Sequence, residues 1–478
     1  MSYEPKLLTR SWEDNFLFEL KPKEPWLAIF GLVLFVGMSL IVGGPVAIAA
    51  FPLGSLLVGW LLYRRYPILY CGFVWWLWFV GPLVRRIIDY RCGYLTPGPW
   101  TLTAALVTSI SVLTLVKYLP RAYKYGGTFC TIAFVCCIYG WIISVVNDGF
   151  VDRGLFILLE WLGPVSFCFH LLVNWRDYPR YRQNIQRIFL WGTLALGIYG
   201  LIQYVFAPQW DRFWLEQIGT DGTLSFGIPE PFGIRVSSMM DAPQTFASMI
   251  TVGLILLYSR ERGRNLWANG IGYLSFLLSL ARASWLGWLV SISVLFPSLK
   301  NKLKIRLLTS IFLVVLIILP VTTIEPFSTV ISERFESFTD TEEDGSYEAR
   351  LEGYSRLIGV AMGEYVGKGI KNPIEPDVEL KTDFVVFDNG ILTLLFSLGW
   401  IGGLPYTLSM LLPLAPIRQT YLKNNDLFVN ATFAIIVGLL AQIMLKTINS
   451  SSMGMILWGF LGIGMSARNY YSYQNQQK

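Results

Sequence analysis

Residues 26–63 have the sequence WLAIFGLVLFVGMSLIVGGPVAIAAFPLGSLLVGWLLY, with no charged side chain before Arg64 and Arg65. A helix rises 1.5 Å per residue, so about 20 apolar residues cross the hydrocarbon core of a bilayer. This segment is therefore long enough for two successive spans, which we place at 26–43 and 45–63. A chain that starts in this way is typical of a helical membrane protein.

The composition of the whole chain supports the same interpretation. Of its 478 residues, 54% are hydrophobic and 15% are charged, and the mean hydropathy is +0.50. Soluble globular proteins carry about 25% charged residues, so an ordinary soluble enzyme is excluded. We expect an all-α, polytopic transmembrane helical bundle of about fourteen spans. The expected spans lie approximately at 26–43, 45–63, 66–84, 100–116, 126–146, 155–173, 188–206, 244–258, 266–280, 283–298, 307–323, 399–417, 427–445 and 452–467.

The positions of the basic residues predict the orientation of the bundle. Cytoplasmic loops of membrane proteins are enriched in Lys and Arg. Most of the 38 Lys and Arg residues fall on the cytoplasmic side if both termini are placed there, so the net charge of +6 reflects topology, and no nucleic-acid partner is expected. The first apolar run follows a polar, basic segment and lacks a small-residue cleavage site, which predicts a first span and not a signal peptide.

Two loops on the predicted outer side are much longer than the other connections. Long ordered loops in compact proteins are usually functional. The second loop is rich in acidic residues over 333–352, and such a stretch must face water. We therefore divide the chain into a cytoplasmic N-terminal segment (1–25), N-terminal transmembrane helices (26–206), a first long outer loop (207–243), transmembrane helices with the Arg282 turn (244–323), a large outer loop with short helices (324–398), C-terminal transmembrane helices (399–467) and a cytoplasmic tail (468–478).

Arginine residues on the predicted outer side are candidate binding groups for a phosphate. The planar guanidinium grips phosphate oxygens and keeps its charge. The candidates are Arg235 before a span, Arg282 in a short turn, and Arg350 and Arg356 in the large loop. An arginine at a span end also simply snorkels to the interface, and Arg350 lies among acids with which it could form a surface ion pair. The cysteines lack CxxC spacing and His170 is the single histidine, so we expect no metal site.

Several short segments together resemble a known family. They are RVSSMMDAPQTFASM (235–249), RAS at 282–284, GKG at 367–369, DNGIL at 388–392 and GWIG at 399–402. Their order, and their placement on the predicted outer face, is similar to the O-antigen ligase/polymerase (Wzy/WaaL) superfamily. The resemblance covers roughly residues 185 to 465, and the earlier spans match only in general character.

The resemblance implies a GT-C-like fold and a metal-independent glycosyltransferase without a cofactor in the plasma (inner) membrane of a bacterium. The donor would be a glycan on undecaprenyl pyrophosphate, and the acceptor a saccharide or a lipid. Arg235 and Arg350 match the family's outer-loop arginines thought to bind the pyrophosphate, and Arg282 matches its small-residue arginine motif. Membrane lipids, a flippase and a chain-length regulator are the further partners that the resemblance implies.

One position departs from the family pattern. Many ligases have a His-Asn pair whose histidine is the proposed base, whereas this chain has Asp388-Asn389. His170 lies near the predicted inner end of a span and cannot replace that base. A carboxylate can accept a hydroxyl proton in a positioned site, so Asp388 is the candidate catalytic residue. Asp388 could equally cap the short helix that follows.

Two other functions remain open at this stage. The first is transport, because members resembling this superfamily in some photosynthetic bacteria are labelled inorganic-carbon transporters. A carrier usually has acidic or broken-helix sites near the middle of the membrane, and Glu160 and Asp148 come closest to that pattern. The second is a non-catalytic membrane scaffold with a binding loop, which predicts that alanine replacements of the outer arginines are harmless.

Overall fold

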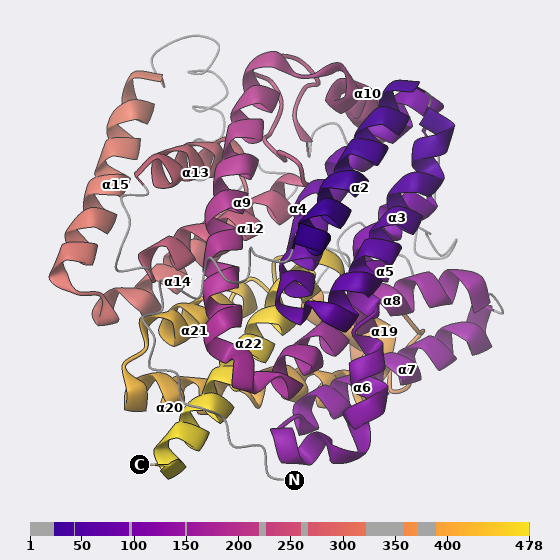
Figure 1. Ribbon diagram of the computed structural model, residues 1–478, viewed down its shortest axis with the longest axis vertical. Helices are drawn as coiled ribbons and strands as arrows, with labels where there is room; N and C mark the ends of the chain where they lie inside the picture. The colour runs from indigo at the N-terminus through magenta and orange to yellow at the C-terminus, as the bar shows by residue number, and fades with distance from the viewer. Residues whose placement is uncertain are drawn as a thin grey trace.

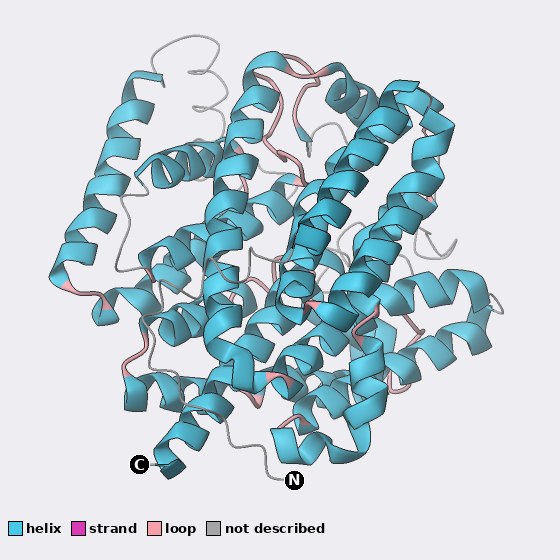
Figure 2. Cartoon of the chain, viewed as in Figure 1, coloured by secondary structure: helices cyan, strands magenta, loops and turns pink. Residues whose placement is uncertain are grey.

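The computed structural model describes residues 23–42, 44–94, 98–148, 151–218, 226–259, 266–321, 358–370 and 389–477. Within these ranges the chain is almost entirely helical and contains no strand, apart from one isolated β-bridge between Gly227 and Ile234 (Figure 2). The prediction of an all-α membrane protein is confirmed. Arg350, Arg356 and Asp388 lie outside the described residues.

Most of the helices follow one another with short connections, and Figure 1 shows their arrangement. They are α2 (Lys23–Val42), α3 (Gly44–Arg65), α4 (Pro67–Cys92), η1 (Pro99–Leu102), α5 (Thr103–Ser109), α6 (Val112–Tyr118), η2 (Leu119–Tyr125), α7 (Thr128–Asp148), α8 (Val151–Val173), η3 (Trp175–Asp177), α9 (Tyr178–Phe206), α10 (Gln209–Ile218), α12 (Pro243–Tyr258), α13 (Leu266–Leu278), α14 (Arg282–Leu295), η4 (Phe296–Ser298), α15 (Asn301–Val321), α19 (Gly390–Leu411), α20 (Leu414–Asn424), α21 (Leu427–Leu440) and α22 (Ser451–Gln477).

Helix α22 lies in the core of the bundle. All of its residues from Ser452 to Ala467 are buried, and it packs along α8. A Cβ atom added at Gly462 would lie 2.8 Å from the carbonyl oxygen of Cys168. Small residues let membrane helices approach one another closely, so glycine at this position permits the close contact of α22 and α8.

Eight helical segments of the described chain are long and apolar enough to cross a membrane. The helices α12, α13, α14 and α21 are shorter, with 16, 13, 14 and 14 residues. A helix of 13 residues reaches only about 20 Å, less than the roughly 30 Å of a hydrocarbon core. The count of fourteen spans therefore stays a prediction. Three of the short helices, α12, α14 and α21, pack against one another.

The expected span at 100–116 is interrupted in the structure. It is divided between η1, α5 and α6, with a turn at Ile110 and Ser111. The Ser111 hydroxyl group bonds the carbonyl oxygen of Thr108 and the hydroxyl of Ser166. Side chains that bond the nearby backbone compete with the regular helix, which accounts for the break.

Helix α19 contains a kink where the sequence analysis places the start of a span. Gly399 has φ 61° and ψ −173°, which no helical residue adopts. A Cβ atom at this position would overlap the carbonyl oxygen of Tyr365, so the close approach of the 358–370 segment also requires glycine. The kink separates residues 390–398 from the helix that follows.

Candidate functional site

The structure brings the predicted site residues Arg235 and Arg282 to the same turn. The Arg235 guanidinium donates to the carbonyl oxygens of Ser279 (3.4 Å) and Leu280 (3.0 Å), immediately before α14 begins at Arg282. Leu280 has φ 51°, an unfavourable value for leucine, so the turn depends on such contacts. Part of the hydrogen-bonding capacity of Arg235 thus stabilises the turn that presents Arg282, whose side chain is exposed.

Helices α12 and α14 both begin without a side-chain cap. Their N-cap residues are Ala242 and Ala281, and neither position supplies a side-chain hydrogen bond to the first turn. A helix N-terminus carries partial positive charge and backbone N–H groups that bind anions. In membrane proteins, half-length helices often direct such ends at anionic ligands. The two starts are joined, because the Ser284 hydroxyl donates to the carbonyl oxygen of Gln244 (3.3 Å).

A buried lysine lies directly behind these two helix starts. Lys446 belongs to the connection between α21 and α22 and is 4% exposed. Its ammonium group donates to the hydroxyls of Ser248 on α12 and Ser284 on α14, the latter at 3.2 Å. The two hydroxyls lie 3.1 Å apart. No carboxylate of the described residues pairs with Lys446, and burial lowers the pKa of its amine to about 7.

The start of α19 packs against the same connection. The backbone N–H of Gly390 donates to the carbonyl oxygen of Ile443 (2.7 Å), and the hydroxyls of Thr393 and Thr447 lie 3.3 Å apart. Asn389 is the N-cap residue of α19, since its side-chain oxygen accepts from the N–H groups of Ile391 and Leu392. The capping role that the sequence left open for Asp388 is therefore filled by its neighbour.

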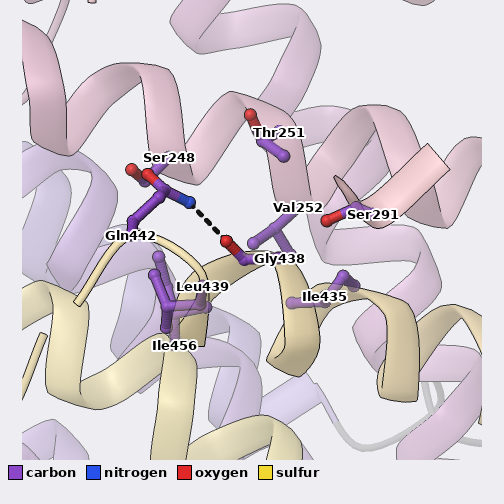
Figure 3. Close-up of a pocket in the computed structure, with 9 residues that line it drawn as sticks. All are labelled: Ser248, Thr251, Val252, Ser291, Ile435, Gly438, Leu439, Gln442 and Ile456. Atoms are coloured by element: carbon purple, nitrogen blue, oxygen red, sulfur yellow. Dashed lines mark hydrogen bonds between the residues drawn. The ribbon is translucent and has the colours of Figure 1, made fainter. Parts of the chain in front are cut away.

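A small cavity of about 10 Å³ lies between α12, α14, α21 and α22, beside Ser248 (Figure 3). It is lined by residues of the short helices, by Ile456 of α22 and by Gln442 of the connection. Such a volume holds about one water molecule. The Gln442 amide donates to the carbonyl oxygen of Gly438 (2.8 Å), but its buried side-chain oxygen has no hydrogen-bond partner. Ser248 both lines the cavity and accepts from Lys446.

The loop that carries Arg235 also carries an acidic residue, Asp241. Asp241 lies within electrostatic reach of Glu160 on α8 and of Arg85 on α4. Burial raises the pKa of the Asp241 carboxyl, and a hydrogen bond from Thr245 and the charge of Arg85 partly offset this rise. One oxygen of this carboxyl is buried without a hydrogen-bond partner.

Sequence analysis did not identify Lys446 as a site residue. Its local sequence, QIMLKTINSS, has the form of a lysine that snorkels from the end of an apolar run. The serines that hold it are 198 and 162 residues distant along the chain. His170 is buried beside Thr114, Tyr63 and Tyr70, and within the described chain its hydrogen bonds and ring contacts include none of the site residues.

Comparison with known proteins identifies no family for the chain. No family model matches the chain, and no curated protein matches it in sequence. The fold defines an all-α, multi-pass membrane protein. Its candidate site combines two uncapped helix starts with the side chains of Arg235, Arg282 and Lys446.

Proposed function

We propose that the chain is a glycosyltransferase of the O-antigen ligase/polymerase type. It transfers or polymerises saccharides carried on undecaprenyl pyrophosphate, on the outer face of a bacterial plasma membrane. The observation that carries this proposal is the convergence of Arg235, Arg282 and the uncapped starts of α12 and α14. These are the groups that would bind a pyrophosphate held at the surface of a membrane protein.

The same groups suit the chemistry of transfer. The acceptor hydroxyl oxygen forms a bond to the anomeric carbon while the bond from that carbon to the pyrophosphate oxygen breaks, and undecaprenyl pyrophosphate leaves. Negative charge grows on the departing oxygen, and preorganised N–H donors and guanidinium groups stabilise it. The acceptor proton passes to a base, for which Asp388, next to the N-cap residue of α19, is the candidate.

A deletion strain tests the proposal. Loss of the protein should remove long surface glycan and increase the pool of undecaprenyl-linked oligosaccharide. Wild type and Arg418→Ala should restore the long glycan and the normal size of the lipid-linked pool. Arg282→Ala should restore neither the glycan nor the pool, although Arg282 and Arg418 are both exposed residues of helices. Each variant must first be shown to reach the membrane at wild-type abundance. An unchanged glycan and an unchanged lipid-linked pool in the deletion strain would contradict the proposal.

Transport is the second candidate function, and the acidic pair of Glu160 and Asp241 favours it. Carriers place ionisable groups inside the bundle, where they bind coupling ions or substrate. The deletion strain separates the two functions, because a carrier predicts lost solute uptake with normal lipid-linked oligosaccharide. In that case Glu160→Gln should abolish uptake, and Arg282→Ala should leave the glycan unchanged.

A further inference from the structure

Lys446 is a buried cation with no acidic partner in the described part of the chain, and this arrangement needs an explanation. Removing a charge from water is strongly unfavourable unless an opposite charge or several hydrogen bonds replace the water. Two serine hydroxyls supply two of the three acceptors that an ammonium group can use. The group that supplies a negative charge to balance the Lys446 ammonium is therefore to be identified.

We propose that Lys446 is the buried half of an anion-binding site, and that a phosphate group of the ligand is its counter-ion. The exposed half is the first turn of α14 with Arg282. Ser284 links the halves, because it is the third residue of α14 and accepts from the Lys446 ammonium at 3.2 Å. This inference rests on the proposed function, whose ligand contacts it specifies.

The surroundings of Lys446 favour an anion over a metal cation. Among the described residues, its neighbours are the Ser248 hydroxyl of α12, the Ser284 hydroxyl of α14, and the start of α19, where the Thr393 hydroxyl lies beside that of Thr447. None of them is a carboxylate, and Arg282 adds positive charge at the start of α14. Two helix starts contribute further positive potential. The charges of Lys446 and Arg282 would repel a metal cation.

Binding of an anion here is coupled to protonation. In the absence of a ligand, burial lowers the pKa of Lys446 to about 7, so the amine loses its proton as the pH rises through that value. A bound phosphate favours the charged amine and raises its pKa. Above about pH 7 the site therefore takes up a proton when it binds the anion, and affinity falls as the pH rises.

The test uses the full-length protein in lipid nanodiscs and titration calorimetry in buffers of different ionisation heat. The first probe is inorganic sulfate, a divalent phosphate mimic that does not titrate between pH 6.5 and 8.5, so any proton uptake belongs to the protein. We expect wild type to take up most of one proton at pH 7.5 and to bind sulfate roughly tenfold more weakly at pH 8.5 than at pH 6.5.

Three variants locate the effect. Lys446→Arg keeps the charge at every pH, so its affinity should not depend on pH. Lys446→Met should bind at pH 6.5 roughly tenfold more weakly than wild type and take up no proton. Lys423→Met removes an exposed lysine from α20 and should behave as wild type. Equal affinity and equal proton uptake in wild type and Lys446→Met would overturn the proposal. If Lys446→Met fails to reach the membrane, binding of sulfate to wild type without proton uptake overturns it equally.

Two further probes identify the source of the phosphate. Geranyl pyrophosphate binding more tightly than inorganic pyrophosphate supports a lipid-linked ligand, and equal affinity supports a free phosphate compound. The glycan experiment remains independent of these results. If glycan synthesis depends on Arg282 but Lys446→Met changes neither sulfate affinity nor proton uptake, this inference is refuted and the proposed function is not. If anion binding depends on Lys446 but the glycan is unchanged in the deletion strain, the proposed function is refuted and the anion-binding site is not.

Discussion

Arg86 on α4 and Asp211 on α10 form an ion pair in which the guanidinium is 1% and the carboxylate 0% exposed. A second nitrogen of Arg86 donates to the carbonyl oxygens of Ser238 and Met240, in the loop that continues from Arg235. Arg86 thus attaches both α10 and this loop to the bundle. The span expected at 66–84 ends on the predicted outer side, where basic residues are less common, and the buried bonds of Arg86 to these two segments account for an arginine there.

Replacing Arg86 should destabilise the protein strongly. Arg86→Met leaves the Asp211 carboxylate buried without its cation, and breaking such a pair costs about 3–5 kcal/mol. The second change Asp211→Asn should recover part of this loss. The measurement is the free energy of unfolding in a fixed detergent or nanodisc. Arg91→Met, at an exposed position of the same helix, is the control, and an equal stability of the Arg86 and Arg91 variants would refute the prediction.

Gly399 should not tolerate a side chain. Gly399→Ala places a Cβ at φ 61°, which costs about 1–2 kcal/mol, and adds an overlap with the carbonyl oxygen of Tyr365. We expect a lower midpoint of thermal unfolding. Gly37→Ala on α2 is the matched control, because nothing lies within 4 Å of the added Cβ and alanine favours a helix. The prediction is wrong if both variants unfold like wild type.

The two residues of the Asp388-Asn389 pair should have separable effects. Asn389→Ala removes the side-chain acceptor for Ile391 and Leu392, so the start of α19 should lose about 1 kcal/mol of stability. Asp388→Asn should lower glycan transfer by roughly 10²-fold or more, without a comparable loss of stability, if Asp388 is the base. Unfolding curves and product analysis on the same membranes measure the two effects. Transfer at the wild-type rate in Asp388→Asn would exclude the base.

Arg282 should matter more for transfer than for folding. Its side chain is exposed at the first residue of α14, so Arg282→Ala should change stability little, while the loss of one donor to the departing pyrophosphate should lower the rate roughly 10²-fold. Arg282→Lys keeps the charge but lacks the bidentate geometry of the guanidinium, so its transfer rate should lie between those of wild type and Arg282→Ala. Rates are compared with those of Arg418→Ala. If the lower rate of Arg282→Ala is explained by a smaller amount of folded protein, Arg282 has a structural role instead.

Much of the fold could be predicted because apolar length reports helices directly. The expected span at 155–173 corresponds to α8, which begins at Val151 and ends at Val173. The end of α21 was harder to locate, since the apolar run continues to residue 445 whereas the helix ends at Leu440. A hydropathy pattern does not show that residues 441–450 are not helical. It also does not show that Lys446, in this segment, contacts α12 and α14.

The site was only partly accessible from sequence for a physical reason. Arg235 and Arg282 could be proposed because each lies beside an apolar run, a feature that is local in the chain. Their common turn, however, depends on hydrogen bonds between segments 44 and 45 residues apart. The part played by Lys446 depends on serines much farther away, so no local pattern distinguishes it from a lysine at a span end.

The stability of the ligand-free protein should depend on pH through Lys446. Its pKa is about 7 in the folded state, against an ordinary value of 10.5, so between these values the unfolded chain binds more protons. Stability from this group is then full above about pH 10.5 and falls as the pH decreases toward 7. Lys446→Met lacks this penalty, so it should unfold at a higher temperature than wild type at pH 7, and the difference should shrink by pH 9.5. Thermal unfolding of both proteins at the two pH values measures it. A constant difference would mean that burial does not lower the pKa of the Lys446 amine. Saturating sulfate at pH 7 should also narrow the difference in unfolding temperature, because wild type binds the anion more tightly than Lys446→Met and is stabilised more by it.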